Sequence, residues 1–234
     1  MNTTKLNAKK ILLPVGGILL ILLLLVMWLR PSFTAPKLPP AELSAVAVEN
    51  LLSAESIAFH TESKLTLNEE STPLGDLSGE ICGTDFHVQG EVLGTAVNMY
   101  QIGETTFRQD TLTEQWLTLS DGELLTNDSL LNEINPRAFF KLAAINDAAE
   151  AGEESIDEEK CWKITFTPQT EAGYYEKYFD TITCTLWITR DDRQIRQAEI
   201  AACAHAGEQQ STLTVTTEFW GWNETEPIQA PIVQ

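Results

Sequence analysis

The longest apolar run of the chain lies close to its N-terminus and constrains everything that follows it. Residues 11–29 read ILLPVGGILLILLLLVMWL, with no charged residue and no Asn, Gln or Ser. As an α-helix, these nineteen residues span about 28 Å, close to the hydrocarbon thickness of a bilayer. A helix of a soluble core explains the run less well, because it is unbroken, terminal and flanked by basic residues. The run therefore predicts a transmembrane helix.

Charges beside the run predict its orientation. More basic residues precede it than follow it: Lys5, Lys9 and Lys10 against Arg30 and Lys37. Positive charge tends to stay in the cytoplasm, so residues 1–10 are predicted to be a cytoplasmic tail and residues 30–234 to lie outside the membrane.

A cleavable signal peptide is the main alternative for residues 11–29. Such peptides usually have an apolar core of about 7–15 residues, followed by a site of small residues. Here Trp28-Leu29-Arg30-Pro31 ends the run, and no cysteine stands near it to receive a lipid. We therefore expect residues 11–29 to remain as the signal anchor of a single-pass protein of the cell membrane.

The part beyond the anchor divides into a stalk and one domain. Residues 30–40 contain four prolines and predict a stiff stalk with a reach of about 30 Å. Residues 41–234 are enough for one extracytoplasmic domain with a sizeable core. The chain has 34 acidic and 15 basic residues, for a net charge of −19. Such a surface repels phosphate backbones, so we expect no nucleic-acid partner.

Four cysteines lie beyond the anchor, where oxidation is possible: Cys82, Cys161, Cys184 and Cys203. They permit two disulfides in three connectivities. Free buried thiols are the alternative, because each cysteine falls in a segment that resembles a strand. Both interpretations stay open at this point.

Alternating apolar and polar residues predict a series of strands after one short helix. Residues 41–52 carry apolar side chains at helical spacing, namely Leu43, Val46, Ala47 and Leu51. In residues 56–67, one face carries Ile57, Phe59, Leu65 and Leu67 and the other carries His60, Glu62 and Lys64. Further strands are predicted at 77–88, 91–102, 105–109, 115–119, 161–167, 182–189, 194–204 and 211–219. Turn signals at 72–76, 89–90 and 191–192 make the sheet antiparallel.

The middle of the chain predicts helices. Residues 130–134 and 136–149 have helical sequences, and the second places Phe139, Leu142 and Ala143 on one side with Phe140 beside them. Residues 150–160 read as an acidic, solvated loop, because they lack the residue order of a calcium-binding loop. Residues 171–180 are rich in tyrosine and predict a short helix or loop.

This order of elements predicts a mainly β (α+β) domain. We expect a curved, open antiparallel half-barrel with helices packed on its concave face, preceded by the transmembrane helix. Five segments then resemble one known superfamily: residues 59–67 (FHTESKLTL), 100–107 (YQIGETTF) with Trp116, 136–142 (PRAFFKL), 186–189 (LWIT) before Asp191-Asp192, and Phe219 with Trp222, Asn223 and Pro227. The pattern resembles the lipoprotein carriers that include the periplasmic factor LolA and the LppX/LprG-type lipoproteins. This chain departs from that pattern in having a membrane helix in place of a lipidated cysteine.

The resemblance implies a cavity for a lipid or another amphiphile inside the half-barrel. The candidate residues are Ile57, Phe59, Leu65, Leu67, Phe139, Phe140, Leu142, Trp162 and Phe166. A filled core needs the same residues, so the sequence does not separate the two. The first hypothesis is a membrane-tethered binding protein for an amphiphile, and the alternative is a cell-envelope interaction or sensor domain that binds a protein partner.

Catalytic and metal-binding patterns are sparse. The chain has no G-x-S-x-G motif and no local pairing of cysteine with histidine, so we expect neither catalysis nor a cofactor. His60 and His87 fall on the first two predicted strands and, with Glu62 or Asp85, form a metal-site hypothesis. Surface positions on a strand explain these residues more simply, so the sequence-based expectation is no metal.

Overall fold

The structure is a computed structural model, and it describes residues 37–119, 135–170, 174–207, 209–224 and 226–232. Residues 37–234 form one unit. The predicted tail, membrane segment and most of the stalk lie outside the described residues, as does the predicted helix at 130–134. None of the described helices is long and apolar enough to cross a bilayer.

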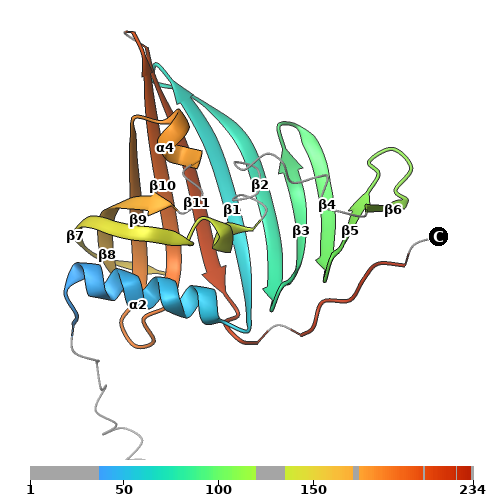
Figure 1. Ribbon diagram of the computed structural model, residues 1–234, viewed down its shortest axis with the longest axis horizontal. Coiled ribbons are helices and arrows are strands. Elements are labelled where there is room, and N and C mark those ends of the chain that lie inside the picture. The colour runs from blue at the N-terminus through green and yellow to red at the C-terminus, as the bar shows by residue number, and fades with distance from the viewer. Residues whose placement is uncertain (1–36, 120–134, 171–173, 208, 225, 233–234) are drawn as a thin grey trace, which may run out of the picture. The chain divides into compact units, whose positions relative to one another are not determined.

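The described residues form one antiparallel sheet of eleven strands (Figure 1). The strands of the first half are β1 (Ser56–Leu67), β2 (Glu70–Cys82), β3 (Asp85–Val92), β4 (Thr95–Ile102), β5 (Thr105–Gln109) and β6 (Trp116–Leu119). Those of the second half are β7 (Leu142–Ile156), β8 (Glu159–Thr170), β9 (Thr181–Thr189), β10 (Ile195–Ala206) and β11 (Gln209–Trp220).

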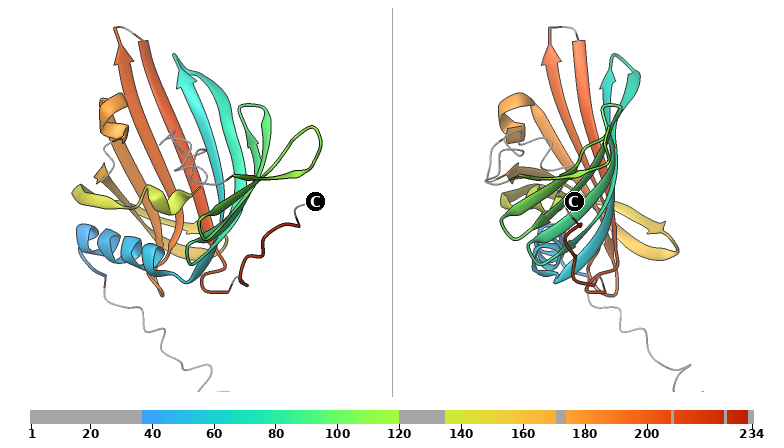
Figure 2. Two further views of the ribbon diagram at one scale, coloured as in Figure 1. Left: turned by 45° about the vertical axis from the view of Figure 1, so that its right-hand side comes forward. Right: turned by 90° about the vertical axis from the view of Figure 1, so that its right-hand side faces the viewer.

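The spatial order β6-β5-β4-β3-β2-β1-β11-β10-β9-β8-β7 joins two meanders through their first and last strands. The β1–β11 register pairs Phe59 with Phe219, Thr61 with Thr217 and Leu65 with Leu213. Strands β6 and β7 end the sheet, which is therefore open, and it curves around the face that carries the helices (Figure 2). The predicted open, mainly β half-barrel is confirmed.

One long helix and two single turns lie on the concave face among the described residues. They are α2 (Pro40–Ser53), the 3₁₀ turn η1 (Pro136–Ala138) and α4 (Tyr174–Tyr178). Helix α2 begins at Pro40, where a missing N–H costs nothing, and it contacts β7, β9 and β10. It buries Leu43, Ala47, Val48 and Leu51. The predicted helix at 41–52 is therefore correct.

The predicted helix at 136–149 and the acidic loop at 150–160 are wrong. After η1 the chain forms β7, which pairs with β8 through a turn at Asp157 and Glu158. The Ala- and Glu-rich sequence has high helix propensity, but pairing with the otherwise open edge of β8 overrides that preference. The register of β7 shifts at three points: Leu142/Ala144, Asn146/Ala149 and Glu150/Gly152.

These shifts explain why the sequence of β7 imitates a helix. Leu142, Ile145 and Ala148 lie three residues apart, and all three pack against the core. An uninterrupted strand alternates faces every residue, but each bulge moves the alternation by one. A bulged strand thus acquires a spacing of three on its inner face.

Two predicted turns are also wrong, because the first half of the sheet contains one more strand than expected. Residues 72–76 lie inside β2 and residues 89–90 lie inside β3, while the real turns fall at 68–69, 83–84 and 93–94. Gly90 has φ +147°, and a Cβ there would lie 2.0 Å from the Asp76 carbonyl oxygen. Glycine is needed at this position because β2 approaches closely.

Cys82, Cys161, Cys184 and Cys203 are all free. Cys161 and Cys184 are buried, and burial raises the pKa of the Cys161 thiol to about 11 and that of Cys184 further. The structure therefore favours the free-thiol interpretation over disulfides.

Candidate ligand site on the concave face

Five aromatic rings pack together on the concave face beside α2, and we call them the aromatic plug. They are Phe59 of β1, Phe219 of β11, Phe139 and Phe140 after η1, and Tyr175 of α4. Ring centroids lie 5.2 Å apart for Phe139–Phe140, 5.4 Å for Phe139–Tyr175 and 6.4 Å for Phe140–Phe219, all in edge-to-face arrangements. None of the five side chains is more than 2% exposed. Edge-to-face contacts of this kind add to the stabilisation from burial.

Gly79 of β2 allows the aromatic plug to pack closely on the sheet. Phe59 and Gly79 are cross-strand partners, and a Cβ on Gly79 would lie 2.6 Å from the Phe59 ring. The ring of Phe59 therefore lies over the glycine backbone, which leaves it no freedom to move toward β2.

A buried arginine holds η1, and with it the two plug residues that follow. Arg137 donates from Nη2 to the Ala54 carbonyl oxygen at 2.8 Å and from Nη1 to the Gly83 carbonyl oxygen at 3.4 Å. Its Nε has no hydrogen-bond partner among the described residues. Burial lowers the pKa of Arg137 below its usual value. The guanidinium thus joins the C-cap of α2 and the β2–β3 turn.

A band of hydroxyl groups crosses the concave face beyond the plug. Thr61 and Thr217 are both buried, and their hydroxyl oxygens lie 3.0 Å apart. Ser63, the next inward residue of β1, is also buried. These hydroxyl groups separate the aromatic plug from apolar residues further along β1 and β11.

Half-buried apolar side chains lie beside and beyond the hydroxyl band, and we call them the upper patch. The patch comprises Leu65, Val92, Val97 and Leu213, which are half-buried on the inner face of β1, β3, β4 and β11. Leu65 and Leu213 are cross-strand partners. The concave face therefore carries apolar surface that its plug does not cover.

A groove of about 730 Å³ lies between α2 and the start of β7. Its lining includes Val48 and Leu52 of α2, the plug residue Phe140, and Leu142 and Ile145 of β7. The groove therefore reaches the edge of the aromatic plug. The groove residues of α2 are not among the predicted site residues, although a second apolar stripe at helical spacing marks them in the sequence: Ala41, Ala45, Val48 and Leu52.

The structure separates the predicted site residues into three groups. Six lie in the core and are at most 4% exposed: Ile57, Phe59, Phe139, Phe140, Trp162 and Phe166. Leu65 and Leu142 are half-buried, and Leu67 is 50% exposed. Leu65 and Leu142 thus border open apolar surface, while the six core residues pack against one another.

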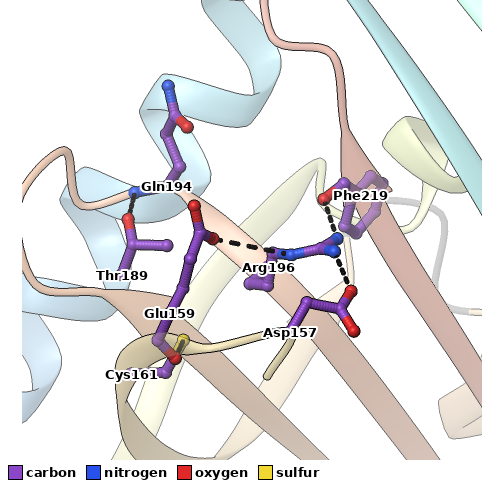
Figure 3. A network of polar contacts seen from close by, with 7 residues as sticks. All are labelled: Asp157, Glu159, Cys161, Thr189, Gln194, Arg196 and Phe219. Atoms are coloured by element: carbon purple, nitrogen blue, oxygen red, sulfur yellow. Dashed lines mark hydrogen bonds and ion pairs between the residues drawn. The ribbon is translucent and has the colours of Figure 1, made fainter. Parts of the chain in front are cut away.

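A polar network joins three strands at the end of the sheet near α2 (Figure 3). Arg196 of β10 donates from Nη1 to the Phe219 carbonyl oxygen at 2.7 Å, and it forms ion pairs with Asp157 and Glu159 of the β7–β8 hairpin. Cys161 donates to the Glu159 carbonyl oxygen. Because Arg196 already has two carboxylate partners, this network reads as a structural connection between the hairpin and β11.

His60 and His87 are not neighbours in the structure, although the metal-site hypothesis requires that they are. Strand β2 separates His60 from His87, which lies within hydrogen-bond distance of Asn98 and stacks on Tyr100 with ring centroids 3.9 Å apart. The pairing of His60 with His87 is therefore wrong. His60 instead meets Asp76 on the outer face of the sheet, which is the face away from α2 and the plug.

Two mycobacterial proteins of known structure share the fold of this chain. The lipoprotein LppX of Mycobacterium tuberculosis aligns with a TM-score of 0.51 at 15% identity, over 80% of this chain and 97% of LppX. LprF of Mycobacterium bovis aligns with a TM-score of 0.53 at 10% identity, over 81% of this chain and 95% of LprF. No protein-family model and no curated protein sequence matches the chain. The predicted resemblance to LppX-type proteins therefore holds for the fold.

Proposed function

We propose that this chain is a membrane-tethered, extracytoplasmic binding protein for a lipid or another amphiphile. The single observation that carries the proposal is apolar surface on the concave face that the chain's own plug leaves uncovered, in the upper patch and in the α2–β7 groove. Burying apolar surface yields about 25 cal/mol per Å², so an acyl chain gains most where a concave apolar surface is already formed.

The shared fold supports the same proposal. LppX is a lipoprotein by name, and LprF has the same architecture. Both align with this chain over nearly their whole length, so the three proteins share one fold.

The proposed tether consists of residues 11–29 as a signal anchor and residues 30–36 as a stalk, since Leu38 packs against the domain core and Pro40 begins α2. Residues 1–10 would lie in the cytoplasm and the half-barrel outside the cell membrane. A domain on a stalk of about 20 Å stays near the outer leaflet, so it exchanges ligand with its own membrane surface. We propose no catalytic residue, cofactor or nucleic-acid partner for this activity.

Photocrosslinking of the full chain in lipid nanodiscs tests the proposal. The probe is a phospholipid with a diazirine on one acyl chain, and mass spectrometry of the digested protein locates the crosslinks. We expect crosslinks on the upper patch, at Leu65 or Leu213, and on the α2–β7 groove. Crosslinks confined to residues 11–29, with none on the concave face, would contradict the proposal.

A filled half-barrel that binds a protein partner is the second candidate function. The complete burial of the aromatic plug favours it, because the five plug side chains leave no room for a ligand between them. This function predicts no lipid crosslink on the concave face and a single envelope protein crosslinked to the outer face or to an edge strand in cells.

A further inference from the structure

One histidine and two carboxylates meet on the outer face of the sheet. His60 Nε2 lies 2.8 Å from Asp76 Oδ1. One ligand atom from each of His60, Glu62 and Asp76 lies within 4.8 Å of the other two. The cluster is on the opposite face from the proposed amphiphile site, so neither inference depends on the other.

The register of β1 and β2 builds this cluster. Residues two apart on a strand share a face, which places His60 and Glu62 side by side on β1. Glu62 is the cross-strand partner of Asp76, and His60 is the partner of Ser78. Asp76 is therefore the diagonal neighbour of His60, and long side chains reach each other across that diagonal.

Negative charge accumulates around the cluster. Asp76 is paired with Glu91 on β3 as well as with Glu62, and His60 is paired with Glu218 on β11. Like charges directly opposite each other destabilise a sheet. Lys64 is on the same face of β1, but no ion pair joins it to either carboxylate in the described part of the chain. A bound cation would remove this repulsion.

The imidazole distinguishes this cluster from an ordinary acidic patch. Calcium prefers six to eight oxygen ligands, whereas imidazole nitrogen together with carboxylate oxygen suits zinc and its neighbours in the first transition series. Zinc commonly takes three protein ligands and leaves a fourth position to water. Bonds of 2.0–2.2 Å place tetrahedral ligands about 3.4 Å apart, which lies between the observed 2.8 Å contact and the 4.8 Å limit. We propose that His60, Glu62 and Asp76 bind a divalent transition-metal ion of the Zn²⁺ type.

Calorimetric titration of ZnCl₂ into the tag-free, metal-free full chain in detergent micelles tests this site. We expect one Zn²⁺ per chain. His60→Gln and Glu62→Gln should each raise the Kd at least about tenfold, because loss of a second-shell partner alone typically costs about 10–100-fold in affinity. All three residues are on the surface, and far-UV circular dichroism checks that each variant keeps its fold.

His205 supplies a matched control. Its Nδ1 lies 3.0 Å from Asp180 Oδ2, so it is also a histidine paired with a carboxylate, but it belongs to no three-ligand cluster of the described residues. His205→Gln should leave the Kd for Zn²⁺ unchanged. Binding of Co²⁺ in place of Zn²⁺ should give visible absorption bands in the wild type and in His205→Gln, and none in His60→Gln.

Three results would overturn the metal site. They are no Zn²⁺ binding, equal Kd values for the wild type and His60→Gln, and equal competition by Ca²⁺, which would show a plain acidic surface. The amphiphile site fails separately, since its loss in a Leu213→Glu variant should not change the Kd for Zn²⁺.

Discussion

At the scale of single residues, the groups that matter most are buried polar side chains that join elements. Arg137 joins the end of α2, the β2–β3 turn and η1, and it lies next to Phe139 and Phe140 of the plug in sequence. The sequence alone shows an ordinary basic residue in PRAFFKL. Its role depends on the carbonyl groups of Ala54 and Gly83, which only the folded chain brings to it.

Replacing Arg137 should therefore destabilise the domain. Arg137→Ala removes two hydrogen bonds from a charged donor to the carbonyl oxygens of Ala54 and Gly83, so we expect a loss of about 2 kcal/mol in the free energy of unfolding. Arg137→Lys should recover part of it, since one donor head reaches fewer acceptors than the guanidinium fork. Chemical denaturation monitored by tryptophan fluorescence measures both. Equal stability of Arg137→Ala and the wild type would contradict this role.

Glu154 should contribute to stability in a pH-dependent way. A hydrogen bond from Trp187 Nε1, at 2.8 Å, and the nearby Lys163 hold the pKa of the Glu154 carboxyl below its usual value. A lowered folded-state pKa means that this stabilisation is present above the unfolded-state pKa of about 4.5 and is lost as pH falls through the folded-state pKa. Glu154→Gln should therefore flatten the decline of the unfolding midpoint below pH 4.5, as measured by urea titrations at several pH values. An unchanged slope would exclude the contribution.

At the scale of elements, the sequence predicts those strands and helices whose bounds depend only on the spacing of their own apolar residues. The bounds of β1 at residues 56–67 and the short α2 follow directly from their apolar patterns. The helix expected at 136–149 fails because bulges give β7 a helical spacing, and the turn expected at 89–90 fails because Gly90 serves a close strand contact. Both errors arise from contacts between strands, which a local pattern does not contain.

The buried face of α2 should contribute more to stability than its exposed face. Leu51 is fully buried against the sheet, whereas Glu49 is exposed. Leu51→Ala should cost about 2–5 kcal/mol through lost burial and a cavity, while Glu49→Ala should change stability by no more than about 0.5 kcal/mol. Thermal unfolding followed by circular dichroism compares the two. Similar losses in both variants would show that α2 does not pack as described.

At the scale of the whole molecule, the open sheet leaves two surfaces with different chemistry. The concave face holds the aromatic plug, the hydroxyl band and the upper patch. The outer face is largely polar and carries the cluster of His60, Glu62 and Asp76. The candidate site is only partly predictable from sequence, because Phe139 and Phe140 prove to be plug residues while Leu65 and Leu142 border the open apolar surface. Only the three-dimensional structure separates side chains that fill the core from side chains that border the open apolar surface.

Lipid retention by matched variants tests the central claim most directly. Native mass spectrometry would compare the wild-type full chain with Leu213→Glu, which places a charge on the upper patch, and with Thr214→Glu, which places the same charge on the outer face of β11. We predict that a lipid-sized adduct persists on the wild type and on Thr214→Glu and disappears from Leu213→Glu. Equal adducts on all three proteins, or none on any of them, would contradict amphiphile binding on the concave face.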